Sequence, residues 1–116
     1  MEKTIYIDEK PVQLKSTGGT ALRYKAQFGK DYFAEILKLY PLANLQGKDF
    51  SELSIEDMKQ LDFEVFYNLT WVLAKTANPS IPDPITWLDQ FETFPIEDVM
   101  PQLQDIIEAT MSSKKK

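Results

Sequence analysis

The chain has 116 residues, of which 43% are hydrophobic and 27% charged, a mixture typical of one globular domain rather than of a disordered segment. Thirteen Lys and Arg face 18 Asp and Glu, and the net charge of −5 disfavours a nucleic-acid-binding surface, which needs a basic face. The sequence has no Cys and no His, which excludes disulfides, zinc-thiolate sites, cysteine nucleophiles and the commonest general base. The composition therefore predicts a binding protein rather than an enzyme, with no cofactor and no metal.

The first residues predict a β-hairpin. Residues 4–7 and 12–15 are short segments of alternating polarity, and residues 8–11 between them suit a turn. No Asn-Gly or Asp-Gly pair marks this turn, so the pairing of the two strands stays open. One face of the hairpin is expected to carry the apolar side chains of Ile5, Ile7, Val12 and Leu14.

Two short helices are expected next, after a Gly18-Gly19 link that lacks the pattern of a phosphate-binding loop. Thr20 is the expected N-cap of a helix over 21–28, which Gly29 ends. Asp31 is the expected cap of a second helix, over 32–39, which Pro41 ends. Its apolar stripe is predicted to consist of Phe33, Ile36, Leu37 and Tyr40.

Residues 41–53 are interpreted as a linker, followed by a short helix from a cap at Ser54 to about Gln60. Asp62 is then expected to cap the longest clear helix, Phe63 to Ala77. Apolar residues lie nearly all round this helix, which predicts that it occupies the middle of the core. Its Trp71, like Trp87 further on, is interpreted as a core residue rather than part of a ligand site.

The last third predicts two more helices. Asp83 is an N-cap with Pro84 at the first helical position, and the helix that follows carries Ile85, Trp87, Leu88 and Phe91. Pro101 should kink the terminal helix or restart it one turn later. The expected stripe of that helix is Ile96, Val99, Met100, Leu103, Ile106, Ile107 and Met111.

Together these elements predict a mainly helical α+β fold: an N-terminal β-hairpin followed by about five to six helices packed as one small domain. The expected domain covers residues 1–113, with the hairpin at 4–15 and the helical part at 20–112, and residues 114–116 form a basic tail. No stretch approaches the roughly 18 apolar residues of a membrane-spanning helix, and the first residues do not resemble a signal peptide. We therefore expect no membrane contact.

No constellation of residues predicts catalysis. The closest carboxylates, such as Glu97 and Asp98, are better interpreted as signals for the start of a helix. What remains is surface for binding, and the terminal amphipathic helix either completes the chain's own core or contacts a partner, including a second copy of the chain. The expected partner-binding residues are Trp87, Phe91, Leu103, Ile107 and Met111.

Three segments, in this order, carry a resemblance to a known family. The first is a hairpin with Ile-x-x-Lys-Pro-Val-x-Leu-Lys followed by Thr-Gly-Gly-Thr-Ala-Leu-Arg-Tyr-Lys-Ala-Gln-Phe-Gly-Lys-Asp at 17–31. The second runs from Trp71 through Asn78-Pro79-Ser80-Ile81-Pro82-Asp83-Pro84 to Phe94-Pro95, and the third is the helical end with Ser112-Ser113 and the lysine run. The ordered set resembles the tail assembly chaperones of long-tailed phages and prophages of Gram-positive bacteria.

This resemblance implies a non-enzymatic helper in the cytoplasm of the bacterial host that binds the tape measure protein and keeps it soluble during tail tube assembly. The tail tube protein is a further candidate partner, and the chaperone is not expected in the mature virion. The resemblance also implies a longer product made by ribosomal frameshifting, for which the A-rich codons of Lys114, Lys115 and Lys116 are the expected slippery site. The alternative is a structural tail or head-completion component that is retained in the virion.

Overall fold

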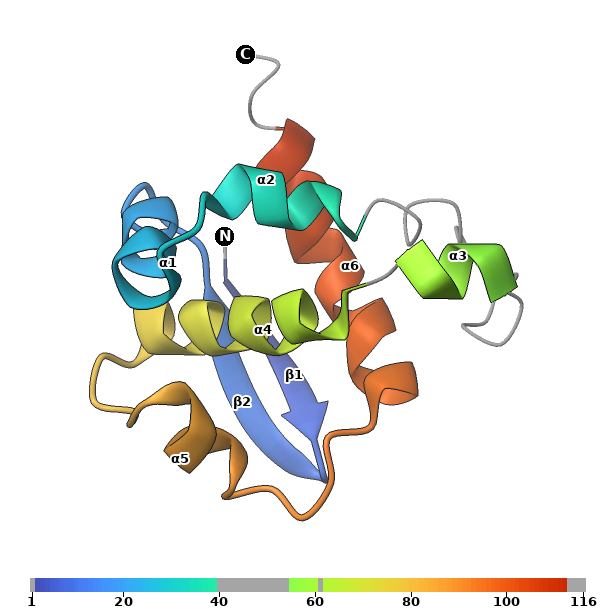
Figure 1. Ribbon diagram of the computed structural model, residues 1–116. Coiled ribbons are helices and arrows are strands. Elements are labelled where there is room, and N and C mark those ends of the chain that lie inside the picture. Colours follow the sequence, from blue (N-terminus) through green and yellow to red (C-terminus); the bar gives the residue numbers. More distant parts are fainter. Residues whose placement is uncertain (1, 40–54, 61, 113–116) are drawn as a thin grey trace.

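The computed structural model describes residues 2–39, 55–60 and 62–112, and in these residues a two-stranded antiparallel sheet is covered by helices (Figure 1). The predicted mainly helical α+β class, with an N-terminal hairpin and six helices in the described residues, is confirmed. The elements are β1 (Glu2–Ile7), β2 (Lys10–Lys15), α1 (Thr20–Phe28), α2 (Tyr32–Leu37), α3 (Ile55–Gln60), α4 (Phe63–Ala77), α5 (Pro84–Leu88) and α6 (Ile96–Ser112).

The hairpin has the predicted inner face but a shorter turn than expected. Ile5 pairs with Val12, and Ile5, Ile7 and Leu14 are buried while Val12 is half-buried. Only Asp8 and Glu9 form the turn, with φ of 53° and 64°, so Lys10 and Pro11 belong to β2 instead. Two residues of positive φ follow the twist of the flanking strands, which makes so short a connection possible, and without glycine this conformation costs energy.

Most of the predicted helix ends are confirmed. Gly29 ends α1 with a φ of 71°, and the Asp31 side chain caps α2 by accepting a hydrogen bond from the Ala34 N–H. The predicted cap at Thr20 is wrong, because α1 already begins at Thr20 and Gly19 precedes it. The Thr20 hydroxyl instead accepts a hydrogen bond from the Thr17 N–H at 2.9 Å.

The predicted stripe of α2 is displaced by one residue. Leu37 is 57% exposed and Phe33 only half-buried, whereas Tyr32, Glu35, Ile36 and Leu39 face the interior. The apolar residues of this segment fit two overlapping helical stripes. The structure buries the stripe that contains Glu35, whose charge has partners in the interior, and not the predicted stripe. The predictions for Tyr40, Pro41, the linker 41–53 and Ser54 concern residues outside those that the structure describes, whereas the short helix to Gln60 is found as α3.

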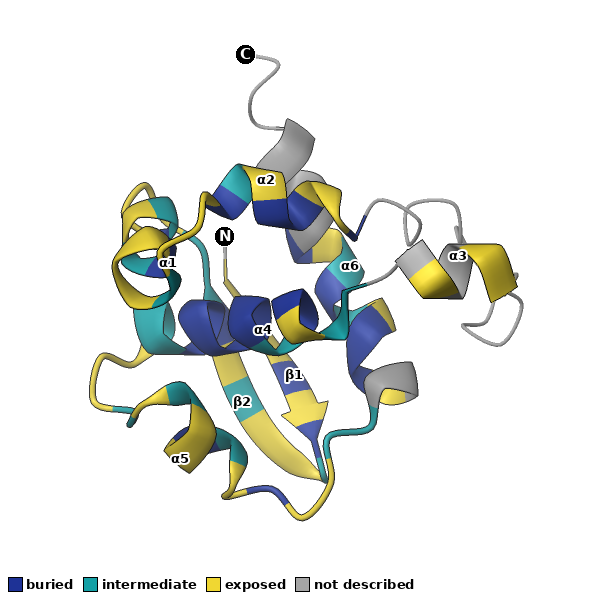
Figure 2. Cartoon of the chain, viewed as in Figure 1, coloured by how far each residue is buried: buried dark blue, intermediate teal, exposed yellow. Residues whose placement is uncertain are grey.

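Helix α4 is the centre of the core, as its sequence predicts. It packs across β2, and every residue from Val65 to Ala74 except Tyr67 is buried (Figure 2). Its cap is Asp62, which accepts from the Glu64 N–H. Trp71 lies in the core, and its indole N–H donates to the Pro82 carbonyl at 2.9 Å, which ties α4 to the connector before α5.

Helices α5 and α6 flank the hairpin on different sides (Figure 1). Asp83 caps α5 with Pro84 at its first position, as predicted, but Phe91 lies beyond the end of the helix. Of the two alternatives expected at Pro101, the restart of the terminal helix one turn later is wrong, because α6 continues through Pro101. Pro101 is exposed and lies early in the helix, where only the carbonyl of residue 97 loses its donor. Among the described residues, no helix is long and apolar enough to cross a membrane.

Candidate functional site

The residues expected to bind a partner are mostly part of the chain's own core. Leu103 is fully buried, Trp87 is 4% exposed and Phe91 9% exposed. The choice of Leu103 as an exposed position for a partner is therefore wrong: Val99, Met100, Leu103 and Ile106 of α6 are buried, and α6 packs on β1, which removes these apolar side chains from water. The side chains of Ile107 and Met111 lie outside the described residues. Whether any of the five contacts a partner stays a prediction.

The outer edge of β1 is closed by α6. The side-chain amide of Gln102 accepts a hydrogen bond from the Tyr6 N–H at 2.9 Å and donates one to the Tyr6 carbonyl at 3.1 Å. Lys3 and Asp105 add an ion pair at 3.1 Å between the same two elements. Gln102 thus satisfies both backbone groups of Tyr6, as a neighbouring strand would.

A hollow of about 540 Å³ beside this edge is acidic. Among the described residues, its charged lining residues are Asp8, Glu9 and Asp98, and none is a Lys or Arg. The Asp8 carboxylate accepts a hydrogen bond from the Glu92 N–H at 3.1 Å, which ties the hairpin turn to the segment before α6. Within residues 2–39, 55–60 and 62–112, no group of three acidic side chains is arranged to hold a metal ion.

The outer edge of β2 borders a different hollow, of about 300 Å³, which we call the β2 groove. It is lined by four consecutive residues of β2, by the end of α4 and by residues in and after α5. Neighbouring residues of a strand point to opposite faces, so four consecutive residues can line one hollow only along the strand's edge. The lining residues are Lys10, Pro11, Val12, Gln13, Ala74, Ala77, Asn78, Ile81, Trp87, Gln90 and Phe91.

The β2 groove combines an apolar floor with a single positive charge. Trp87 and Phe91 pack edge to face, with ring centroids 5.2 Å apart. The Lys10 ammonium lies 5.6 Å from the centre of the Phe91 ring and donates to the Gln90 carbonyl at 2.8 Å. No carboxylate is among the lining residues. The structure therefore brings two of the predicted residues, Trp87 and Phe91, to one hollow, while Leu103 lies elsewhere.

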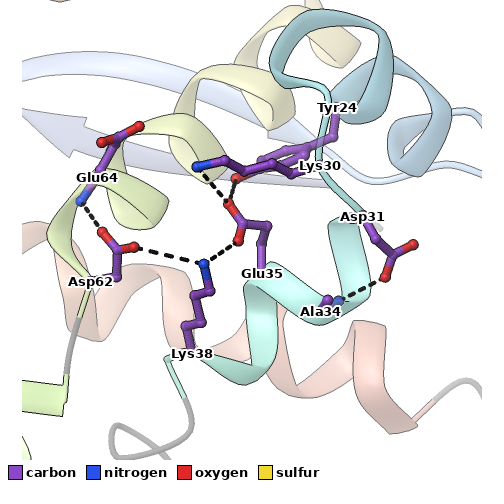
Figure 3. Close-up of polar contacts among 8 residues, drawn as sticks. All are labelled: Tyr24, Lys30, Asp31, Ala34, Glu35, Lys38, Asp62 and Glu64. Atoms are coloured by element: carbon purple, nitrogen blue, oxygen red, sulfur yellow. Dashed lines mark hydrogen bonds and ion pairs between the residues drawn. The ribbon is translucent and has the colours of Figure 1, made fainter.

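A buried carboxylate that the sequence interpretation missed joins three helices (Figure 3). Glu35 of α2 is buried and accepts a hydrogen bond from the Tyr24 hydroxyl of α1 at 3.1 Å. The ammonium of Lys38 lies 2.8 Å from Glu35 and 3.9 Å from Asp62 at the start of α4, and Lys30 lies 4.0 Å from Glu35. Three partners compensate the cost of burying this charge.

The electrostatics of this cluster favour structure over catalysis. Burial, followed by the neighbouring Glu35 charge, raises the pKa of Tyr24 far above its ordinary value, so the phenol keeps its proton and is no nucleophile at neutral pH. The hydrogen bond and charge of Glu35 also raise the pKa of Lys38. A usable signal was present in the sequence, because Glu35 falls on the helical stripe of Tyr32, Ile36 and Leu39.

No protein-family model, curated protein or solved structure gave a significant match to this chain.

Proposed function

We propose that the chain is a phage tail assembly chaperone that binds the tape measure protein and keeps it soluble while the tail tube assembles. The observation that carries this proposal is the ordered resemblance of three segments, at 7–31, at 71–95 and at the helical end. A tape measure protein is a long helical chain with apolar stripes that promote aggregation until the tube covers them. A small acidic binding protein, here with a net charge of −5, would shield those stripes and add solubility.

The proposed contact surface differs from the one that the sequence suggested. Leu103 is fully buried and Trp87 and Phe91 are less than 10% exposed, whereas Leu22 of α1 and Ile85 of α5 are 75% and 73% exposed. Large apolar side chains at such exposure add nothing to the core and are available to a partner. We therefore propose Leu22 and Ile85 as contacts for apolar stripes of the tape measure protein.

Co-expression with the tape measure protein of the same genome tests the proposal. We expect the tape measure protein to stay soluble and to co-purify only when this chain is present. The double variant Leu22→Ser and Ile85→Ser should lose this effect without losing stability, whereas Gln27→Ser, an exposed polar residue of α1, is the matched control. A tape measure protein that stays insoluble, with nothing bound, would contradict the chaperone role.

Mass spectrometry of purified virions separates the chaperone from the alternative, a structural component. A chaperone that leaves before maturation should be missing from the particles. Stoichiometric presence of the chain in purified virions would favour the structural role instead.

A further inference from the structure

We propose that the β2 groove binds an extended segment of a partner protein as an additional antiparallel strand, and that this segment carries an apolar residue followed two positions later by a carboxylate. The inference does not depend on the chaperone role, because it rests on the free backbone and the charge of the groove alone.

The backbone of Gln13 is directed away from β1. In a hairpin with a two-residue turn, the flanking pair Ile7 and Lys10 exchanges hydrogen bonds, and the pairs then alternate. Tyr6 therefore points outward, as its two bonds to Gln102 demonstrate, and so does Gln13. Among the described residues, neither the N–H nor the carbonyl of Gln13 has a backbone or side-chain partner. This pair of groups can hold one residue of an added strand.

Side chains alternate between the two faces of a strand, so only every second side chain of the added strand can enter the groove. The residue opposite Gln13 shares the outer, exposed face of the hairpin. The next residue lies opposite Val12 and points to the inner face, where Ala77, Trp87 and Phe91 line the groove. A hollow of about 300 Å³ accommodates one apolar side chain at this position.

The positive charge of the groove favours a carboxylate in the bound segment. Two residues beyond the apolar position, the added strand lies opposite Lys10, which is the sole charged residue among the described residues that line the groove. No carboxylate of the described residues lies within ion-pair distance of Lys10, so an acid on the added strand would be its first. Opposite charges directly across an antiparallel pair attract. The hollow beside β1, with its three acids, would repel the same segment.

The test uses the synthetic peptide Ser-Thr-Ile-Thr-Glu-Thr-Ser with blocked ends, titrated into the full chain. Binding is followed by the tryptophan fluorescence and by the amide shift of Gln13 in NMR spectra. Methylation of the peptide nitrogen at the second residue, which faces Gln13, should weaken binding about tenfold, since it removes a backbone donor. Methylation at the third residue, whose N–H faces away, is the matched control and should change binding little. Replacing Glu by Lys should also weaken binding about tenfold.

Two protein variants distinguish the two edges. Gln13→Pro removes the outward N–H of β2 without breaking a bond to β1, as Pro11 already does on the same strand. It should weaken binding about tenfold. Thr4→Pro makes the matched change on β1 and should leave binding unchanged. If either variant fails to fold, the two methylated peptides still decide the question on the wild-type chain.

Several results would overturn the proposal. No saturable binding of the peptide up to about millimolar concentration would do so. Equal binding of the two methylated peptides would show that the groove takes a side chain without strand pairing. Equal binding of the Glu and Lys peptides would remove the charge argument. A dimer in analytical ultracentrifugation that Gln13→Pro dissociates would mean that a second copy of the chain occupies the edge.

Discussion

The two outer edges of the hairpin differ in how their backbone groups are satisfied. At the edge of β1, Gln102 bonds both backbone groups of Tyr6, and an acidic hollow lies alongside. At the edge of β2, the equivalent groups of Gln13 face a groove with an apolar floor and Lys10. Unpaired strand edges invite association, and proteins usually cover or charge them. One small sheet can thus have one edge whose backbone groups are bonded and one whose groups are free, and the difference depends on a few side chains.

The cover over β1 should be the more costly one to disturb. Leu103→Ala removes a fully buried side chain between α6 and the hairpin, and we expect a loss of about 3 kcal/mol in the free energy of unfolding. Ile85→Ala, on the β2 side, should change it by less than about 0.5 kcal/mol. Urea denaturation of both variants measures the contrast. Equal effects would mean that the Leu103 side chain stabilises the fold no more than an exposed one does.

Tyr24 lies away from both edges, so a substitution there should change the stability of the whole fold without changing either edge. Tyr24→Phe removes the hydrogen bond to Glu35 and should cost about 1 to 2 kcal/mol at neutral pH. The folded state raises the pKa of Tyr24, so its contribution is complete below the ordinary value of 10.0 and decreases as the pH rises above it. The urea midpoints of the variant and the wild type are measured at about pH 7 and at about pH 11. The difference between the two proteins should be smaller at the higher pH. A constant difference would contradict the raised pKa.

Gln102→Ala should convert the edge of β1 into one like that of β2. Three exposed hydrogen bonds of the Gln102 side chain are lost, two to Tyr6 and one to the Asp98 carbonyl, for which we expect about 1 kcal/mol of destabilisation. Gln27→Ala, an exposed glutamine of α1, is the control and should have little effect. Hydrogen exchange gives the sharper measurement: the Tyr6 amide should exchange faster in the variant, while the Gln13 amide stays as it is. An unchanged Tyr6 amide would show that Gln102 does not close the edge.

The turn that joins the two edges offers the smallest effect. Glu9 has a φ of 64°. This conformation is energetically unfavourable for a residue that has a side chain, but not for glycine. Glu9→Gly should therefore raise the free energy of unfolding by about 0.5 to 1 kcal/mol. Glu56→Gly in α3 makes the same exchange in a helix and should lower it by a similar amount. The same sign for both variants would contradict the strained turn.

Local signals in the sequence predicted much of the fold. Capping chemistry found Asp31, Asp62 and Asp83, and the glycine at 29 ended α1 where expected. The all-round apolar pattern placed α4 in the core, with the bounds that the structure has. Each of these signals depends on a few neighbouring residues, which is why the sequence carries them without knowledge of the tertiary structure.

Contacts between distant residues could not be predicted in the same way. Nothing near Gln102 indicates that it bonds Tyr6, 96 residues earlier, and nothing near Lys10 indicates the Phe91 ring. The stripe of α2 was ambiguous until Tyr24 and Lys38 supplied partners for Glu35. The β2 groove was missed for the same reason: Trp87 and Phe91 were identified, but the strand edge beside them is defined only by the tertiary structure.

The bond between Tyr6 and Gln102 has a consequence for the synthesis of the chain. The hairpin is translated before α6, so the edge of β1 cannot receive its cover from Gln102 and Asp105 until residues 102–105 have been translated. At roughly 5 to 20 residues per second, this interval lasts on the order of ten seconds. A hairpin that forms in a nascent chain before this point has two unpaired strand edges that can pair with a neighbouring chain, and the arrival of α6 covers one of them.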